Sequence, residues 1–87
     1  MSRYTVQFTP KAGDWLRSQR DVKLQTRIVA AAERLADNPR PPGCVKLSGV
    51  EDVWRIRVGD YRILYEIQNA RLVILVIRIA NRRDAYR

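Results

Sequence analysis

The sequence has 87 residues, enough for one hydrophobic core, and we expect a single domain over residues 1–87. Its apolar content of 46% is ordinary for a globular protein and argues against disorder. Seventeen Lys and Arg against nine Asp and Glu give a formal net charge of +8, and fourteen of the seventeen are arginine. A folded domain with this charge attracts polyanions, nucleic acid first, unless the charge serves only solubility. The positions of the arginines have to decide between these two interpretations.

The sequence also limits the compartment. The longest apolar run, residues 72–77, is far shorter than the roughly 20 residues that a membrane-spanning helix needs. The N-terminus lacks the pattern of a secretory signal, and the single cysteine, Cys44, allows no intramolecular disulfide. We therefore expect a cytoplasmic protein with no membrane partner.

The first half of the chain predicts one strand and a helical hairpin. Residues 3–8 alternate between polar and apolar side chains, which is typical of a half-buried strand. Thr9-Pro10 then predicts the start of a helix over Pro10–Ser18. A second helix should begin after Asp21 and end at Asn38-Pro39. The apolar stripe of this second helix comprises Leu24, Ile28, Ala31 and Leu35.

The second half predicts a β-meander. Residues 38–44, NPRPPGC, form a stiff irregular connection, because three prolines and a glycine exclude regular structure. Strands follow over Val53–Val58, 61–67 and 71–79, and the last is so apolar that we place it in the interior of the sheet. The predicted fold is α+β in the order β-α-α-β-β-β, an antiparallel sheet with the helical hairpin packed on one face.

Arginines gather on one face of the predicted hairpin. A two-residue turn at Gly59-Asp60 pairs Arg57 with Arg62 and puts Arg55 on the same face, away from the helices. Directly opposed side chains have Cβ atoms about 4.5–5.5 Å apart, and like charges there are destabilising. The pattern makes sense if an anion binds between the guanidinium groups, and phosphate is the natural candidate. The alternative is a set of solvated arginines that splay apart or pair with carboxylates. Those carboxylates would be Glu51, Asp52 or Glu66.

Further basic residues flank the hairpin. Arg82 and Arg83 follow the last strand, where Arg82 can approach the hairpin, and Tyr86 lies near the end of the chain. Lys46 precedes the hairpin and can add a contact to an RNA phosphate. Because the sequence has no histidine, one cysteine and no carboxylate cluster, we expect neither a metal nor another cofactor. A nuclease of this composition would act through charge, with the 2′-hydroxyl of RNA as the nucleophile.

The runs PRPPGCVKLSG, VWRIRVGDYRILYEI and IANRRDAYR resemble the RelE/ParE toxin superfamily, and in particular its RelE branch of mRNA interferases. The hairpin run is the most specific of the three. The resemblance implies a compact sheet with an N-terminal helical hairpin and a toxin held inactive by a cognate antitoxin. It also implies cleavage of messenger RNA while the message occupies the ribosomal A site.

The resemblance extends to single residues. It implies catalytic roles for Arg57, Arg62, Arg82 and Tyr86, and RNA binding by Arg55. We expect Arg57 and Arg62 to hold the scissile phosphate, Tyr86 to act as general base or to stack on a base, and Arg82 to stabilise or protonate the leaving 5′-oxygen. Lys46 and Arg83 are additional RNA-binding candidates. The family's type member has lysines at the positions of Arg55 and Arg57, and arginine favours phosphate binding over proton transfer there.

Two other functions fit the same sequence. A toxin of the ParE branch would share the fold but would inhibit DNA gyrase without cutting RNA. A non-catalytic module that binds RNA or the ribosome would keep the charge and its salt sensitivity. The joint presence of the hairpin arginines, Arg82 and a terminal tyrosine favours the nuclease.

Overall fold

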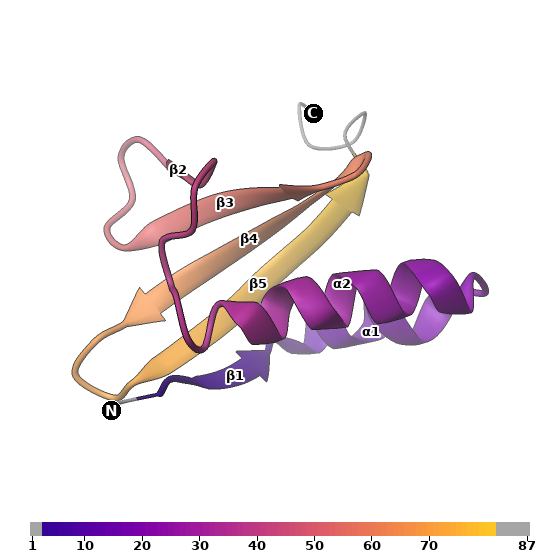
Figure 1. Ribbon diagram of the computed structural model, residues 1–87, viewed down its shortest axis with the longest axis horizontal. Coiled ribbons are helices and arrows are strands. Elements are labelled where there is room, and N and C mark those ends of the chain that lie inside the picture. The colour runs from indigo at the N-terminus through magenta and orange to yellow at the C-terminus, as the bar shows by residue number, and fades with distance from the viewer. Residues whose placement is uncertain (1–2, 82–87) are drawn as a thin grey trace.

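The computed structural model describes residues 3–81, in which two helices pack on one face of a five-stranded sheet (Figure 1). The strands are β1 (Thr5–Phe8), β2 (Val45–Lys46), β3 (Val53–Val58), β4 (Tyr61–Gln68) and β5 (Val73–Asn81), and the helices are α1 (Pro10–Ser18) and α2 (Val22–Arg34). The predicted α+β fold with a helical hairpin on one face of the sheet is confirmed. Neither helix in the described range is long and apolar enough to cross a bilayer.

The sheet has the order β1-β5-β4-β3-β2, with β3, β4 and β5 in the predicted antiparallel meander. The apolar strand β5 lies in the interior, as expected. Two details differ from the prediction: β1 pairs with β5 in parallel, and β2 adds a two-residue strand at the far edge. Alternation of side chains is the same in parallel and antiparallel strands, so the sequence pattern of β1 carried no information about its direction.

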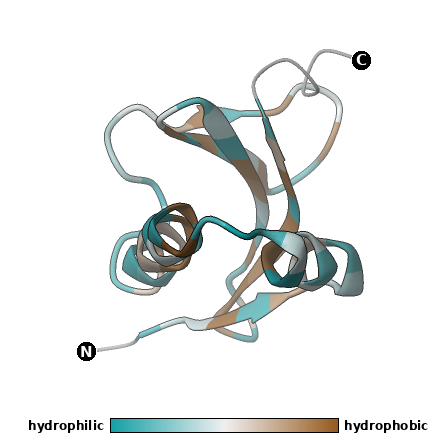
Figure 2. Cartoon of the chain, turned by 90° about the vertical axis from the view of Figure 1, so that its right-hand side faces the viewer, coloured by the Kyte–Doolittle hydropathy of each residue, from teal (hydrophilic) through white to brown (hydrophobic). Residues whose placement is uncertain are grey.

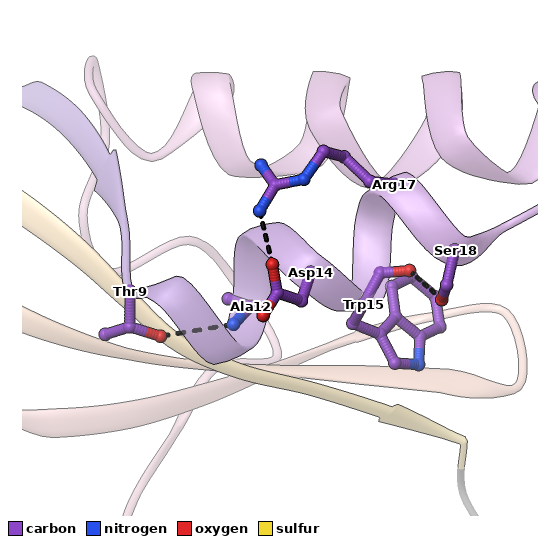
Figure 3. Close-up of polar contacts among 6 residues, drawn as sticks. All are labelled: Thr9, Ala12, Asp14, Trp15, Arg17 and Ser18. Carbon is purple, nitrogen blue, oxygen red and sulfur yellow. Dashed lines mark hydrogen bonds and ion pairs between the residues drawn. The ribbon is translucent and has the colours of Figure 1, made fainter.

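Both helices begin at the predicted side-chain caps. The hydroxyl of Thr9 accepts a hydrogen bond from the Ala12 N–H at 3.2 Å (Figure 3) and donates one to the carbonyl of Ile77 at 2.7 Å. The carboxylate of Asp21 accepts the Leu24 N–H at 3.1 Å at the start of α2. These two hydrogen bonds of Thr9 hold the first turn of α1 against β5.

The core lies between the helices and the sheet. Figure 2 shows hydrophobic residues along the strands and on the side of α2 that is turned toward them. The helices bury Ala12, Leu16, Ile28, Ala31 and Ala32, and the strands bury Ile56, Ile63, Tyr65, Ile67, Ile74, Val76 and Ile79. Because these strand residues occupy one face, their neighbours along β3 and β4 are turned to the other face.

The buried Tyr65 ties the proline-rich connection to the sheet. Its hydroxyl donates a hydrogen bond to the carbonyl of Pro39 at 2.6 Å, and its side chain is inaccessible to solvent. Burial raises the pKa of the Tyr65 hydroxyl above its usual value, and the neighbouring Cys44 thiol adds to this shift. The neutral phenol is therefore part of what stabilises the fold.

Tyr65→Phe should lower the free energy of unfolding by about 1–2 kcal/mol, because the Pro39 carbonyl loses its donor. The folded-state pKa is raised, so the contribution of Tyr65 is complete below about pH 10, where the unfolded phenol is still neutral, and is lost as the pH rises further. Urea unfolding at neutral and alkaline pH measures both effects. Tyr4→Phe, which removes an exposed hydrogen bond to Asn69, is the matched control and should change little. Equal destabilisation of the two variants would contradict the assignment.

Candidate functional site

The β3–β4 hairpin carries three arginines on the face of the sheet opposite the helices. The strand register pairs Arg57 with Arg62, as the two-residue turn predicted. Ile56 and Ile63, which precede and follow these residues, lie in the core beneath the helices. Alternation therefore turns Arg55, Arg57 and Arg62 to the other face, and we call these three residues the arginine face.

A glycine makes the tight turn of this hairpin possible. Gly59 has a φ of +59°, in the left-handed region that glycine adopts without strain. The guanidinium of Arg27, from α2, lies against it, with Nη2 3.1 Å from the position that a Cβ at residue 59 would occupy. The turn that aligns Arg57 with Arg62 is thus in direct contact with α2.

The three arginines differ in exposure. Arg57 is exposed and Arg55 is half-buried, whereas Arg62 is only 4% exposed. Neither Arg55 nor Arg57 forms an ion pair with any residue of the described range, and Glu66, a predicted alternative partner, instead accepts a hydrogen bond from Gln68 at 2.6 Å. Nor do residues 3–81 bring together three potential metal-ligating His, Cys, Asp or Glu side chains. Arg55 and Arg57 therefore offer positive charge to an anion on this face.

A fourth arginine near this face, Arg78 of β5, was missed by the sequence reasoning. The register pairs Arg78 with Leu64, which in turn pairs with Arg55. Arg78 is half-buried and has no carboxylate partner among residues 3–81. The one feature of the sequence that could have indicated Arg78 is that it is a single arginine inside a nearly apolar strand. The irregular register beside Leu64 interrupts the alternation that would have placed it.

Lys46 does not join the arginine face. β2 pairs Lys46 with Trp54, whose ring packs against the core on the helix side of the sheet. Arg40 lies over the same ring, 5.2 Å from its centroid. Lys46 is exposed at the edge of the sheet, on the face opposite the one that carries Arg57.

Three predicted site residues, Arg82, Arg83 and Tyr86, lie outside the described residues, and their roles stay predictions. The last described residue, Asn81, pairs with Tyr61, the first residue of β4 after the hairpin turn. The described part of the chain therefore ends beside the turn that aligns the arginine face.

A groove of about 810 Å³ runs between α2, the proline-rich connection and β3. Its apolar lining includes Ala30, Ala31, Leu35, Ile56 and Val58, and its basic residues are Arg27, Arg34 and Arg57. The groove also contains Asp37, which forms an ion pair with Arg3 at 3.1 Å. The groove thus combines an apolar surface with three arginines, and Arg57 borders both the groove and the arginine face.

Comparison with known protein families gives one match over most of the chain. A family model described as the ParE toxin of the type II toxin–antitoxin system, parDE, matches residues 6–86. Toxin RelG of Mycobacterium tuberculosis (strain ATCC 25618 / H37Rv) is 34% identical over 90 residues, which cover 97% of this chain and 97% of RelG.

Solved structures share the fold. A chain of the archaeal RelE–RelB complex from Pyrococcus horikoshii OT3 superposes with a TM-score of 0.78 at 26% identity, over 92% of this chain and 96% of that chain. A chain of the intact E. coli RelBE toxin–antitoxin complex gives a TM-score of 0.77 at 21% identity, over 90% and 95% of the two chains.

Proposed function

The chain belongs to the ParE toxin family within the RelE/ParE superfamily, and we propose that this member cleaves messenger RNA at the ribosome. The observation that carries this proposal is Arg57 directly opposite Arg62, on a face that neither described helix covers. Like charges at this spacing repel, and a phosphate that accepts hydrogen bonds from neighbouring guanidinium groups offsets that repulsion. The net charge of +8 raises the local concentration of polyanions around the site.

RNA supplies its own nucleophile in the proposed reaction. The 2′-oxygen bonds to the adjacent phosphorus while the bond from that phosphorus to the 5′-oxygen of the next nucleotide breaks. The products are a 2′,3′-cyclic phosphate and a 5′-hydroxyl end. Arg57 and Arg62 hold the non-bridging oxygens and stabilise the negative charge that grows on them, while Arg55 binds the neighbouring backbone.

Two proton transfers complete the reaction. Tyr86 removes the proton from the 2′-hydroxyl or stacks on a base, and Arg82 stabilises or protonates the leaving 5′-oxygen; both roles rest on the family resemblance. Arg83 adds a phosphate contact, and Lys46 does so only for RNA that passes around the edge of β2. Tyrosine and arginine are weak acid–base catalysts near neutral pH, so we expect slow intrinsic chemistry that the ribosome accelerates by orienting the message.

Cleavage of a defined message in a purified translation system tests the activity. The cut positions are mapped by primer extension, with ribosomes and without them. Cuts that require ribosomes support the proposal in full, and cuts in free RNA support a nuclease without ribosome dependence. An intact message at toxin concentrations equal to those of the ribosomes would contradict the nuclease.

A gyrase inhibitor of the ParE branch is the second candidate function, because the matching family model is that of the ParE toxin. Inhibition of gyrase in a plasmid supercoiling assay, together with an intact message, would favour it. A non-catalytic RNA-binding module is the third candidate. Tyr86→Phe leaves a pure binder unchanged but slows an enzyme that uses the hydroxyl.

A cognate antitoxin is the expected protein partner, since two of the structurally similar chains come from toxin–antitoxin complexes. The groove beside α2 suits an acidic amphipathic segment, whose apolar side chains cover the groove and whose carboxylates meet Arg27, Arg34 and Arg57.

Arg34→Glu should weaken antitoxin binding by about tenfold or more, because it puts a like charge against the acidic segment. Titration calorimetry with the cognate antitoxin measures the change. Arg20→Glu makes the same charge change on an exposed residue outside the groove and serves as the control. Equal affinities of the two variants would place the antitoxin elsewhere.

A further inference from the structure

A hollow of about 620 Å³ lies between α1 and the end of β5, apart from the arginine face and from the groove beside α2. This volume is within the range of about 300–1,000 Å³ that is usual for small-ligand sites. Its lining includes Lys11, Asp14, Trp15 and Ser18 from α1, with Arg78 and Ala80 from β5. The reaction proposed above leaves this hollow without a role.

The hollow lies where β5 extends beyond its pairing with β1. The pairing of the two strands ends where Phe8 meets Val76, whereas β5 continues to Asn81. Beyond that point α1 lies beside β5 in place of a strand. Figure 3 shows Trp15 and Ser18 on the side of α1 near the end of β5, with Arg17 on the opposite side.

The charges of the hollow favour an anion. Lys11 is exposed and Arg78 is half-buried, and neither forms an ion pair with another residue in the described range. The one carboxylate of the lining, Asp14, is engaged by Arg17 in an ion pair on the helix surface. Within residues 3–81, these two cations of the hollow are therefore uncompensated.

An aromatic wall accompanies these cations. The Trp15 ring meets Tyr61 edge-on, with 5.5 Å between the ring centroids, and it remains half-buried. Sites that bind single-stranded nucleic acid combine positive charge along the backbone with aromatic rings that contact the bases. Lys11, Arg78 and Trp15 supply both elements in one hollow.

The strand register relates the hollow to the arginine face. Ala80, in its lining, pairs with Arg62, and Arg62 pairs with Arg57. Neighbouring strands are about 4.8 Å apart, so Ala80 lies about 10 Å from Arg57 across β4. A single RNA strand held at the arginine face has the hollow within reach of an adjacent nucleotide.

We propose that the hollow between α1 and β5 binds a second nucleotide of the RNA strand, with its phosphate between Lys11 and Arg78 and its base against Trp15. This inference rests on the proposed function. In this arrangement the RNA crosses the sheet from β3 over β4 to β5. The affinity for RNA should therefore depend on the length of the oligonucleotide.

Binding of 2′-O-methyl RNA tests the subsite independently of cleavage, because the blocked 2′-oxygen cannot react. The probes are a fluorescent dinucleotide and an oligonucleotide of about eight nucleotides. Lys11→Gln/Arg78→Gln should weaken binding of the longer probe about tenfold, and Lys11→Gln alone should leave binding of the dinucleotide unaffected. The slope of log K against log salt should become shallower by about 0.7, because the double variant neutralises one phosphate fewer. Arg20→Gln/Lys23→Gln, which removes the same charge from exposed positions outside the hollow, is the matched control.

The outcomes separate the subsite from the proposed function. If the double variant and the control show the same reduction in affinity and in salt slope, the subsite is wrong, even where the wild type cuts RNA. If the double variant binds the antitoxin more weakly but binds RNA as the control does, the hollow is a protein contact and the subsite is likewise wrong. A wild type that binds the longer probe through Lys11 and Arg78 but leaves messages intact upholds the subsite and contradicts the nuclease.

Because Arg78 is half-buried, Lys11→Gln alone, at an exposed position, provides the same comparison with the fold preserved. This single variant should bind the longer probe more weakly than the wild type does.

Discussion

Arg57→Ala should slow RNA cleavage by roughly 10²- to 10³-fold and leave the free energy of unfolding within about 0.5 kcal/mol of the wild type. Arg57 is exposed and lies directly opposite the buried Arg62, so the substitution removes the accessible half of the pair that holds the phosphate. The fold does not depend on this guanidinium, since like charges across a strand pair are destabilising. Single-turnover rates on a message of known cut position, together with urea unfolding, measure both quantities.

Two further variants make this result specific. Arg20→Ala removes the same charge from an exposed position between the helices and should cleave at close to the wild-type rate. Arg57→Lys keeps the charge but lacks the planar fork, so its rate should lie between those of the wild type and Arg57→Ala. Equal rates for the two alanine variants would show that only overall charge matters and would contradict the assignment of the site.

Ile28→Ala should destabilise the protein by about 2–5 kcal/mol, because it leaves a cavity between α2 and the sheet. Ile28 is completely buried in the core cluster. Domains of this size have total stabilities near the lower end of about 5–15 kcal/mol, so the variant should be close to the threshold of folding. Urea denaturation measures the change in stability.

Val22→Ala is the control for this second prediction. Val22 lies in the first turn of the same helix but is 69% exposed, so the urea midpoint of Val22→Ala should stay near that of the wild type. If the urea midpoint of Ile28→Ala were as high as that of Val22→Ala, the contact of α2 with the sheet would not be what stabilises the core.

The hairpin was the most predictable part of the fold, because a two-residue turn at Gly59-Asp60 leaves a single register for the strands beside it. The parallel direction of β1 was not predictable, since it depends on where the helical hairpin returns the chain to the sheet. β2 was not predicted, because two residues are too few to show an alternating pattern.

The arginine face was predictable as a pattern, but the burial of its members was not. Arg57 and Arg62 alternate in the same way along their strands, yet only Arg62 lies in β4, which has a neighbouring strand on each side. Arg57 lies near the edge, because β2 pairs with β3 only as far as Arg55. The order of the strands in the sheet thus determines how exposed Arg57 and Arg62 are, and the charge pattern of the sequence does not predict that order. Lys46 illustrates the same limit, because its face follows from pairing with Trp54.

The most direct test of RNA cleavage by the 2′-hydroxyl uses a message with one altered ribose. The cut positions are first mapped on the unmodified message, and the nucleotide 5′ to one cut is then replaced by its 2′-O-methyl form. We predict that cleavage disappears at that position, persists at the other mapped positions, and leaves 2′,3′-cyclic phosphate ends there. Continued cleavage at the modified nucleotide would mean that another nucleophile attacks the phosphate, and it would contradict the mechanism built on the arginine face.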